Sequence, residues 1–210
     1  METDGERAIE ALRDAVLADP ENAAFQELGY VPVFRAHPDA RILVVGQAPG
    51  RRAQASEVPF DDASGARLRD WLGFDEATFR DPARVAIVPM DFFYPGRGAG
   101  GDLPPRRGFA ARWHPPLLAL MPRIRLTLLI GAYAQAHYLG PRRRDSLTET
   151  VRAYHDHLPE LMPLVHPSPL NFRWHARNPW FETEVVPELR ELVRGDDEHR
   201  PEEQQRLAAD

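Results

Sequence analysis

Two loops rich in proline and glycine carry the side chains of this chain that are best placed to do chemistry. Residues 46–50 follow the apolar run at 41–45, and residues 166–171 follow a shorter apolar run at 161–165. Both runs have the length and composition of buried strands. Open α/β sheets bind ligands beyond the carboxyl ends of their strands, so we expect the two loops to meet at one site.

His166 is the side chain in these loops with the clearest chemical potential. It lies in a His-Pro-Ser-Pro run, where Pro167 and Pro169 stiffen the backbone around it. A neutral imidazole N–H can stabilise negative charge that develops on a departing group. Ser168 can bind a phosphate or cap the loop. The chain has 8 histidines, and a lone histidine is usually structural, so the case for His166 rests on its loop.

The pattern of apolar residues predicts the elements that position these loops. Strands alternating with helices indicate an α/β fold in three layers, a central, mainly parallel four-stranded sheet flanked by helices. The expected strands are residues 41–45, 85–88, 125–131 and 164–165, and the expected helices are residues 6–18, 64–72, 110–121, 132–139 and 180–193. We expect Ser64 to cap its helix, and breaks near Pro115, Pro116 and Pro187. One domain is predicted over residues 1–195, followed by a charged, disordered tail at 196–210.

The charges are unevenly distributed along the chain. The net charge is −6, but acidic residues concentrate at both ends, whereas arginines cluster at residues 51–52, 106–107 and 142–144. An arginine-rich face of an acidic protein can still bind phosphates, and ordinary solvated surface is the alternative. The N-terminus lacks the pattern of a signal peptide and no apolar run is long enough to span a bilayer. We therefore expect a cytoplasmic monomer with no membrane partner.

Two residue types are missing from the chain, and each absence limits its chemistry. The sequence has no cysteine, so it can form neither a disulfide nor a thiolate metal site. We expect no metal and no cofactor, and activity that survives chelation. The sequence also has no lysine, so all 26 basic side chains are arginine. Arginine stays protonated and cannot form a Schiff base, which leaves only the terminal amine for such chemistry.

The two loops together closely resemble the signature motifs of the uracil-DNA glycosylase superfamily. Further segments, at residues 58–68, 89–96, 101–105 and 178–182, look like those of a bacterial single-domain branch. The resemblance spans about residues 30–195 in the expected order. It implies an α/β fold that acts on DNA containing a damaged or deaminated base. Thermophile-type members carry an iron–sulfur cluster on four cysteines, which this chain cannot hold.

The resemblance implies a role for each of several side chains. Phe60 would stack on the flipped base, and His166 would lie against the pyrimidine O2. Leu170 matches the position of the apolar wedge that fills the gap in the duplex. Asn171 and Arg173 would contact the DNA backbone or the opposite strand. The remaining residues implied in substrate binding are Gly46, Ala48, Pro49, Gly50 and Ser168.

The residue that activates water departs from the pattern of the most active relatives. They place aspartate where this chain has Ala48, and other branches place asparagine there. Thermophile-type members also have alanine at this position, preceded by glutamate where this chain has Gln47. Glutamine can orient a water but is a very poor base. Another thermophile branch uses an aspartate in a segment similar to residues 62–65, which makes Asp62 the first candidate. Helix capping is the alternative role of Asp62, and Asp61 and Asp91 are reserves.

These observations favour a monofunctional DNA glycosylase without lyase activity. Its substrate would be uracil or another deaminated base. The choice of base stays open, because residues 87–90 lack the asparagine that reads pyrimidines in active uracil enzymes. A catalytically weak or inactive DNA-binding protein of the same fold is the main alternative, and Gln47 and Ala48 support it. A nucleotide-handling enzyme is the third hypothesis. The loop at 46–50 matches neither the P-loop nor the dinucleotide fingerprint, which argues against that hypothesis.

Overall fold

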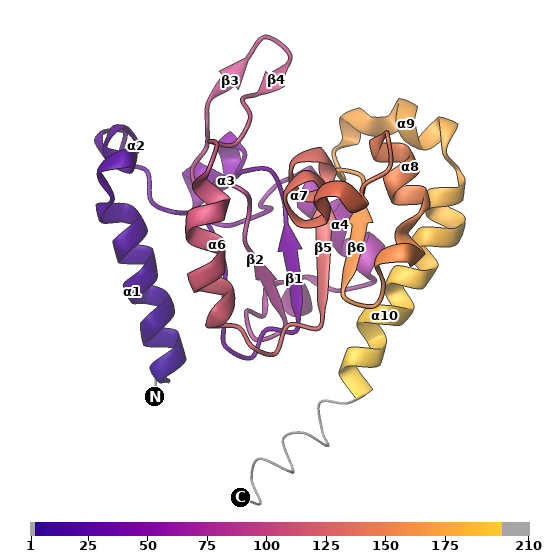
Figure 1. Ribbon diagram of the computed structural model, residues 1–210, viewed down its shortest axis with the longest axis horizontal. Helices are drawn as coiled ribbons and strands as arrows, with labels where there is room; N and C mark the ends of the chain where they lie inside the picture. Colours follow the sequence, from indigo (N-terminus) through magenta and orange to yellow (C-terminus); the bar gives the residue numbers. More distant parts are fainter. Residues whose placement is uncertain (1–2, 199–210) are drawn as a thin grey trace, which may run out of the picture.

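A four-stranded parallel sheet forms the centre of the computed structural model, which describes residues 3–198 (Figure 1). Its strands are β1 (Ile42–Val45), β2 (Val85–Ile87), β5 (Leu126–Ile130) and β6 (Leu161–Leu164), in the order β2-β1-β5-β6. Val44 of the central strand pairs in register with Ile87 on one side and Leu128 on the other. The predicted α/β class and parallel sheet are confirmed.

Helices cover both faces of the sheet. Their bounds are α1 Asp4–Ala18, α2 Ala23–Glu27, α3 Arg51–Ser56, α4 Ala63–Leu72, α5 Glu76–Arg80, α6 Phe109–Ala119, α7 Gly131–Leu139, α8 Leu147–Arg152, α9 Phe172–Arg177 and α10 Val186–Glu198. A short hairpin, β3 (Arg97–Gly98) and β4 (Gly101–Asp102), stands out beyond the sheet (Figure 1). Within the described residues, no helix is long and apolar enough to cross a membrane.

The sheet has a separate hydrophobic core on each face, and β1 contributes to both. Ile42 and Val44 pack into the core that α4 and α10 cover, whereas Leu43 and Val45 pack into the core that α1, α6 and α7 cover. All four side chains are fully buried. Burial on both faces is typical of parallel sheets and explains why this strand reads as a continuous apolar run.

Two local predictions about helices are wrong. Asp62, and not Ser64, caps α4, since its side chain accepts a hydrogen bond from the Gly65 backbone N–H. The helix at 109–119 is continuous through Pro115 and Pro116. Both prolines are exposed, so water can satisfy the carbonyls that their missing N–H groups leave free.

The fourth strand also differs from its prediction, which placed it at residues 164–165. β6 begins at Leu161 and includes Pro163, which pairs in register with Leu129 of β5. A strand interior usually excludes proline. β6 is an edge strand with a single neighbour, so proline is tolerated there.

The last helix is interrupted close to the predicted place. A π-helical segment, Phe181–Val185, precedes α10, which begins one residue before Pro187. α10 extends to Glu198. The rest of the predicted tail, residues 199–210, lies outside the described residues.

Candidate active site

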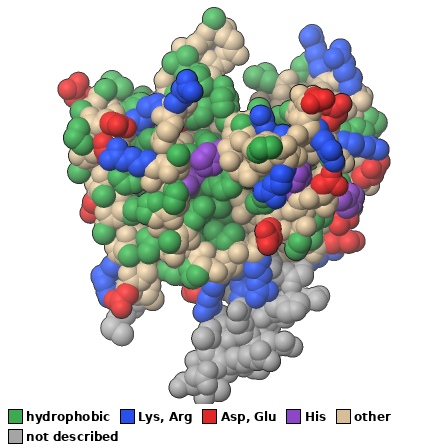
Figure 2. Space-filling model, in the orientation of Figure 1, with side chains coloured by type: hydrophobic (Ala, Val, Ile, Leu, Met, Phe, Trp, Pro, Cys, Tyr) green, Lys and Arg blue, Asp and Glu red, His purple; other side chains and the backbone are tan. Residues whose placement is uncertain are grey.

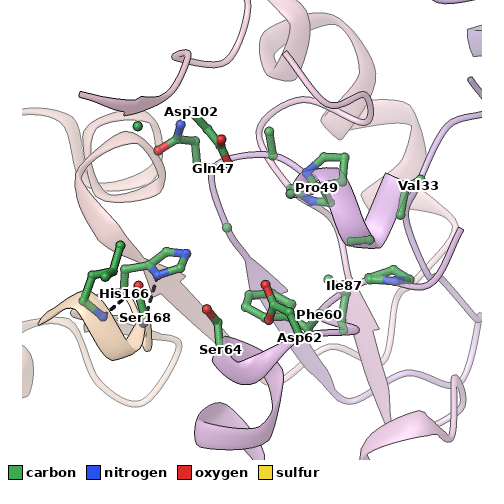
Figure 3. Close-up of a pocket in the computed structure, with 18 of the residues that line it drawn as sticks. Val33, Gln47, Pro49, Phe60, Asp62, Ser64, Ile87, Asp102, His166 and Ser168 are labelled. Atoms are coloured by element: carbon green, nitrogen blue, oxygen red, sulfur yellow. Dashed lines mark hydrogen bonds between the residues drawn. The ribbon is translucent and has the colours of Figure 1, made fainter. Parts of the chain in front are cut away.

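The two predicted loops converge on one cavity at the carboxyl end of the sheet (Figure 3). Its volume is about 510 Å³. Gln47 and Asp102 lie together on one side, Phe60 and Asp62 lie on another, and His166 lies with Ser168 on a third (Figure 3). The lining residues that sequence reasoning singled out are Gly46, Gln47, Ala48, Pro49, Gly50, Phe60, Asp62, His166, Ser168, Leu170 and Asn171. The expectation that the loops meet at one site is confirmed.

The loop at residues 46–50 packs against Phe60 and pairs with the segment after β2. A Cβ on Gly46 would lie 3.6 Å from the ring of Phe60, so that ring packs directly over the loop backbone. The backbone carbonyl of Gly46 accepts a hydrogen bond from the N–H of Met90 at 2.9 Å, which extends the pairing of β1 with the segment after β2. The loop is therefore a fixed wall of the cavity.

Phe60 adopts a backbone conformation that is rare for a residue with a side chain. Its φ is 54°, in the left-handed region. The carbonyl oxygen of Phe60 lies against Gly65 of α4, where a Cβ would come within 1.8 Å of it. Only glycine at position 65 permits this contact. Strained residues of this kind cluster at functional sites, and here the conformation presents the aromatic ring to the cavity.

His166 is held as a neutral ring with one nitrogen free. Its Nδ1 accepts a hydrogen bond from the backbone N–H of Ser168 at 3.1 Å, so the proton of the neutral imidazole is on Nε2. Burial lowers the pKa of His166 below its usual range, while the negative charges of Asp62 and Asp102 oppose this shift. The ring therefore offers an Nε2–H donor at neutral pH.

The loop that carries His166 is itself fixed by side chains of the same motif. Asn171 donates from its Nδ2 to the backbone carbonyl of His166 at 2.7 Å. The hydroxyl of Ser168 accepts a hydrogen bond from the N–H of Leu170 at 3.2 Å, and this leaves its own O–H free to donate. Asn171 thus has a structural contact besides the DNA contact implied for it.

The side chain of Asp62 caps α4 and also lines the cavity. Its Oδ1 accepts a hydrogen bond from the Gly65 N–H at 3.0 Å, which confirms the helix-capping role. Its Oδ2 lies on the side of Gly50, 4.0 Å from where a Cβ of that glycine would stand. The side chain is exposed and lines the cavity, so one carboxylate oxygen remains for a water or a cationic sugar.

The two reserve carboxylates lie elsewhere and are engaged. Asp91 is fully buried and forms an ion pair with Arg106, whose Nε donates to it at 2.8 Å. A hydrogen bond from Ser56, with the neighbouring Arg52 and Arg80, lowers the pKa of Asp61. Neither aspartate lines the cavity.

Asp102 is a cavity residue that sequence reasoning did not single out. It lies on β4, is exposed, and accepts a hydrogen bond from the Tyr94 hydroxyl at 3.3 Å. The next residue, Leu103, is tied to the first loop because the Nε2 of Gln47 donates to its carbonyl at 2.9 Å. The sequence feature that could have identified Asp102 was a carboxylate within the long glycine-rich loop at 91–108, since loops of that length are often functional.

Leu170 and Arg173 occupy the outside of the site. Leu170 lines the rim of the cavity and is 85% exposed, the most of any large hydrophobic residue described. Arg173, on α9, is exposed and does not line the cavity. A second cavity of about 270 Å³ adjoins the first and shares Gln47, His166 and Asn171 with it.

The comparison with protein families agrees with this geometry. The sequence model of the uracil DNA glycosylase superfamily matches residues 34–190, about three quarters of the chain. The chain belongs to the uracil-DNA glycosylase superfamily. Because it has no cysteine, the iron–sulfur cluster of thermophile-type members of the superfamily has no ligands here. Among the described residues there is also no group of three side chains that could hold a metal ion.

A solved structure is also similar, though distantly. It is the solution NMR structure of a protein from Methanosarcina acetivorans that is provisionally named a uracil DNA glycosylase. The two chains share 13% identity with a TM-score of 0.44, over 75% of this chain and 93% of the other. At this level of similarity, we rest the assignment to the uracil-DNA glycosylase superfamily on the match to the family model.

Proposed function

We propose that this superfamily member is a DNA glycosylase that hydrolyses the N-glycosidic bond of uracil or another deaminated base. The observation that carries the proposal is one cavity lined by an aromatic ring, a neutral imidazole and two carboxylates, with an exposed leucine at its rim. Removing a base from duplex DNA requires that the nucleotide be flipped out, held, and attacked at its sugar. Each of these tasks has a candidate side chain here.

The base would leave as an anion that the cavity stabilises. The flipped base stacks on Phe60, and the Nε2–H of His166 donates to a carbonyl oxygen of the base as negative charge develops there. The bond between C1′ and the base nitrogen breaks, and the bonding electrons depart with the base. Because His166 is neutral, it stabilises this charge by a hydrogen bond, and the base takes its proton from solvent.

The attacking water would come from the side of Asp62. Its free oxygen, Oδ2, can accept a proton from the water and stabilise the positive charge on the sugar. The water oxygen forms the new bond to C1′, and the products are a free base and an abasic site. Gln47 orients the water through its carbonyl oxygen, because its amide N–H₂ is engaged with Leu103. Asp102 is the second carboxylate, besides Asp62, whose negative charge opposes the lowering of the His166 pKa by burial.

The reaction would stop at base release. Enzymes that also nick the strand generally use a lysine amine to form a Schiff base with the sugar, and this chain has no lysine. We therefore propose a monofunctional enzyme that leaves the strand intact. We propose separately that it acts as a monomer.

A catalytically weak or inactive DNA-binding protein is the second candidate. One observation favours it: the methyl group of Ala48 cannot bond a water, and the amide of Gln47 is engaged with the carbonyl of Leu103. In that case the cavity would hold a flipped base without cleaving its bond.

A panel of duplex and single-stranded oligonucleotides, each with one deaminated base, separates the two candidates. We expect abasic product from at least one lesion, with strand breakage only after alkali treatment. DNA binding without abasic product from any lesion would support the inactive candidate, and strand breakage before alkali would contradict the monofunctional mechanism.

A further inference from the structure

We propose that the β3–β4 hairpin holds the sugar–phosphate backbone of the damaged strand, through the Arg97 side chain and two backbone N–H groups at the hairpin tip. The proposal rests on the proposed function, because it assumes that a nucleotide of that strand is flipped into the cavity. These contacts need no opposite strand. The protein should therefore bind a damaged single strand as well as a duplex.

The hairpin forms part of the cavity that the flipped base would enter. Residues 100–102 line that cavity. The hairpin stands beyond the carboxyl end of the sheet (Figure 1), and Asp102 lies on a different side of the cavity from His166 (Figure 3). The wedge residue, Leu170, belongs to the loop that carries His166. A nucleotide in the cavity therefore has the wedge loop on one side and the hairpin on another.

The base of the hairpin is fixed in place. The N–H of Leu103 donates to the carbonyl of Gly96 at 2.9 Å, and the carbonyl of Leu103 accepts the hydrogen bond from Gln47. The Leu103 side chain fills the space beside Gly98, where a Cβ would lie 3.1 Å from it. The protein thus sets the direction of the hairpin before any DNA binds.

The tip of the hairpin is a turn made almost entirely of backbone. Gly98 pairs with Gly101, so Ala99 and Gly100 form the turn, and both are exposed. Among the described residues, the N–H groups of Ala99 and Gly100 donate to no protein acceptor. Consecutive free N–H groups in a turn make a concave site for an anion such as a phosphate. The tip projects as a narrow, largely backbone feature above the surrounding surface (Figure 2), so a strand can approach it closely.

Arg97 adds a positive charge beside this turn. It pairs in register with Asp102, and residues opposite each other on antiparallel strands project from the same face. Arg97 therefore shares a face with a residue that lines the cavity. In the part of the chain that the structure describes, the exposed Arg97 forms no ion pair with Asp102 or with any other carboxylate. Its planar guanidinium is suited to bind two oxygens of one phosphate.

The damaged strand is the part of the DNA that lies within reach of the hairpin. A flipped nucleotide stays bonded to its strand on both sides, so its neighbouring phosphates lie at the mouth of the cavity. The hairpin borders the same cavity. Contacts to phosphates position a strand without reading its sequence. The hairpin should therefore contribute equally to the binding of single-stranded and double-stranded DNA, whereas the wedge acts only where a base stack must be opened.

Binding to oligonucleotides with one stable abasic-site analogue tests the tip without requiring catalysis. Ala99 has a negative φ at the first central position of the turn, where proline is favoured, so Ala99→Pro removes one N–H and keeps the turn. Its affinity should fall about fivefold or more on both the single strand and the duplex. Ala99→Ser keeps the N–H and should bind at least about fivefold more tightly than Ala99→Pro.

Leu170→Ala gives the contrasting result, because it should weaken binding to the duplex alone. Three outcomes would overturn the role of the tip. They are a wild-type protein that does not bind the single strand, a loss with Ala99→Pro that is confined to the duplex, and an equal loss with Ala99→Ser.

The salt dependence of binding tests Arg97. Arg97→Ala should reduce the slope of log affinity against log salt by about 0.9 on the duplex and about 0.7 on the single strand. Arg194→Ala is the matched control, an exposed arginine on α10, which ends at the opposite end of the molecule from the hairpin (Figure 1). It should leave both slopes unchanged. An unchanged slope for Arg97→Ala, or a change on the duplex alone, would overturn the contact.

Base release by the wild-type protein is scored separately on a deaminated lesion. Base release without the expected hairpin effects would refute the hairpin proposal alone. The expected hairpin effects without base release from any lesion would refute the glycosylase proposal alone.

Discussion

Replacing His166 by alanine tests the electrostatic part of the mechanism. The hydrogen bond from the Ser168 N–H fixes the free Nε2–H in one orientation before the base arrives, so the donor costs little reorganisation during the reaction. Removing one such preorganised donor typically slows the chemical step by about 10²- to 10³-fold. Since the charge on the base develops only in the transition state, affinity for the lesion duplex should change less than about threefold.

Single-turnover base release and equilibrium binding separate these two effects. The matched variant is His166→Gln, which retains an N–H donor at a similar reach from the backbone and should recover part of the rate. The pH dependence gives a second readout. Burial lowers the pKa of His166, so the neutral form persists below pH 6.5 and the rate should stay level there. A loss in rate below about tenfold for His166→Ala, or a rate that rises as the ring becomes protonated, would refute the reasoning.

Three further predictions follow from the same structure. Asp62→Asn keeps an oxygen to cap α4, so base release should slow by about tenfold or more with little change in melting temperature, and Asp102→Asn shows by comparison which carboxylate serves the water. Gly65→Ala should lower the free energy of unfolding by about 1–3 kcal/mol, because its Cβ meets the Phe60 carbonyl, whereas Gly100→Ala meets nothing and should be neutral in denaturant titrations. Burial lowers the pKa of His114 to about 4, so its neutral form stabilises the fold above pH 6.5 and this contribution falls as the pH drops toward 4. His114→Asn should flatten that acid-side loss in pH-dependent unfolding, and an unchanged slope would contradict the assignment.

The sequence predicted those parts of the fold that depend on the burial of apolar runs. The strand at Ile42–Val45 is buried on both faces, so its composition alone revealed it. The same logic located the two loops, because each follows a strand and carries glycine or proline. Their convergence followed from the general geometry of parallel sheets.

The sequence could not predict features that depend on partners distant in the chain. Asp91 and Asp62 are both aspartates near the motifs, yet one is neutralised by Arg106 and the other faces the cavity. Asp102 lines the cavity at the end of the hairpin, where the next residue, Leu103, is tied to the first loop through Gln47. The predicted effects of proline on the helix and the strand were wrong for a related reason. The exposure of Pro115 and the edge position of Pro163 are set by tertiary packing.

Direct detection of the released base tests the central claim, that this cavity hydrolyses an N-glycosidic bond. Wild-type protein in excess is incubated with a duplex that contains one deaminated base, and the reaction is separated by chromatography without alkali. We predict free base in an amount equal to the lesion, an intact strand that contains one abasic site, and loss of this release with His166→Ala. Duplex that is bound but yields no free base from any deaminated lesion would contradict the proposed activity.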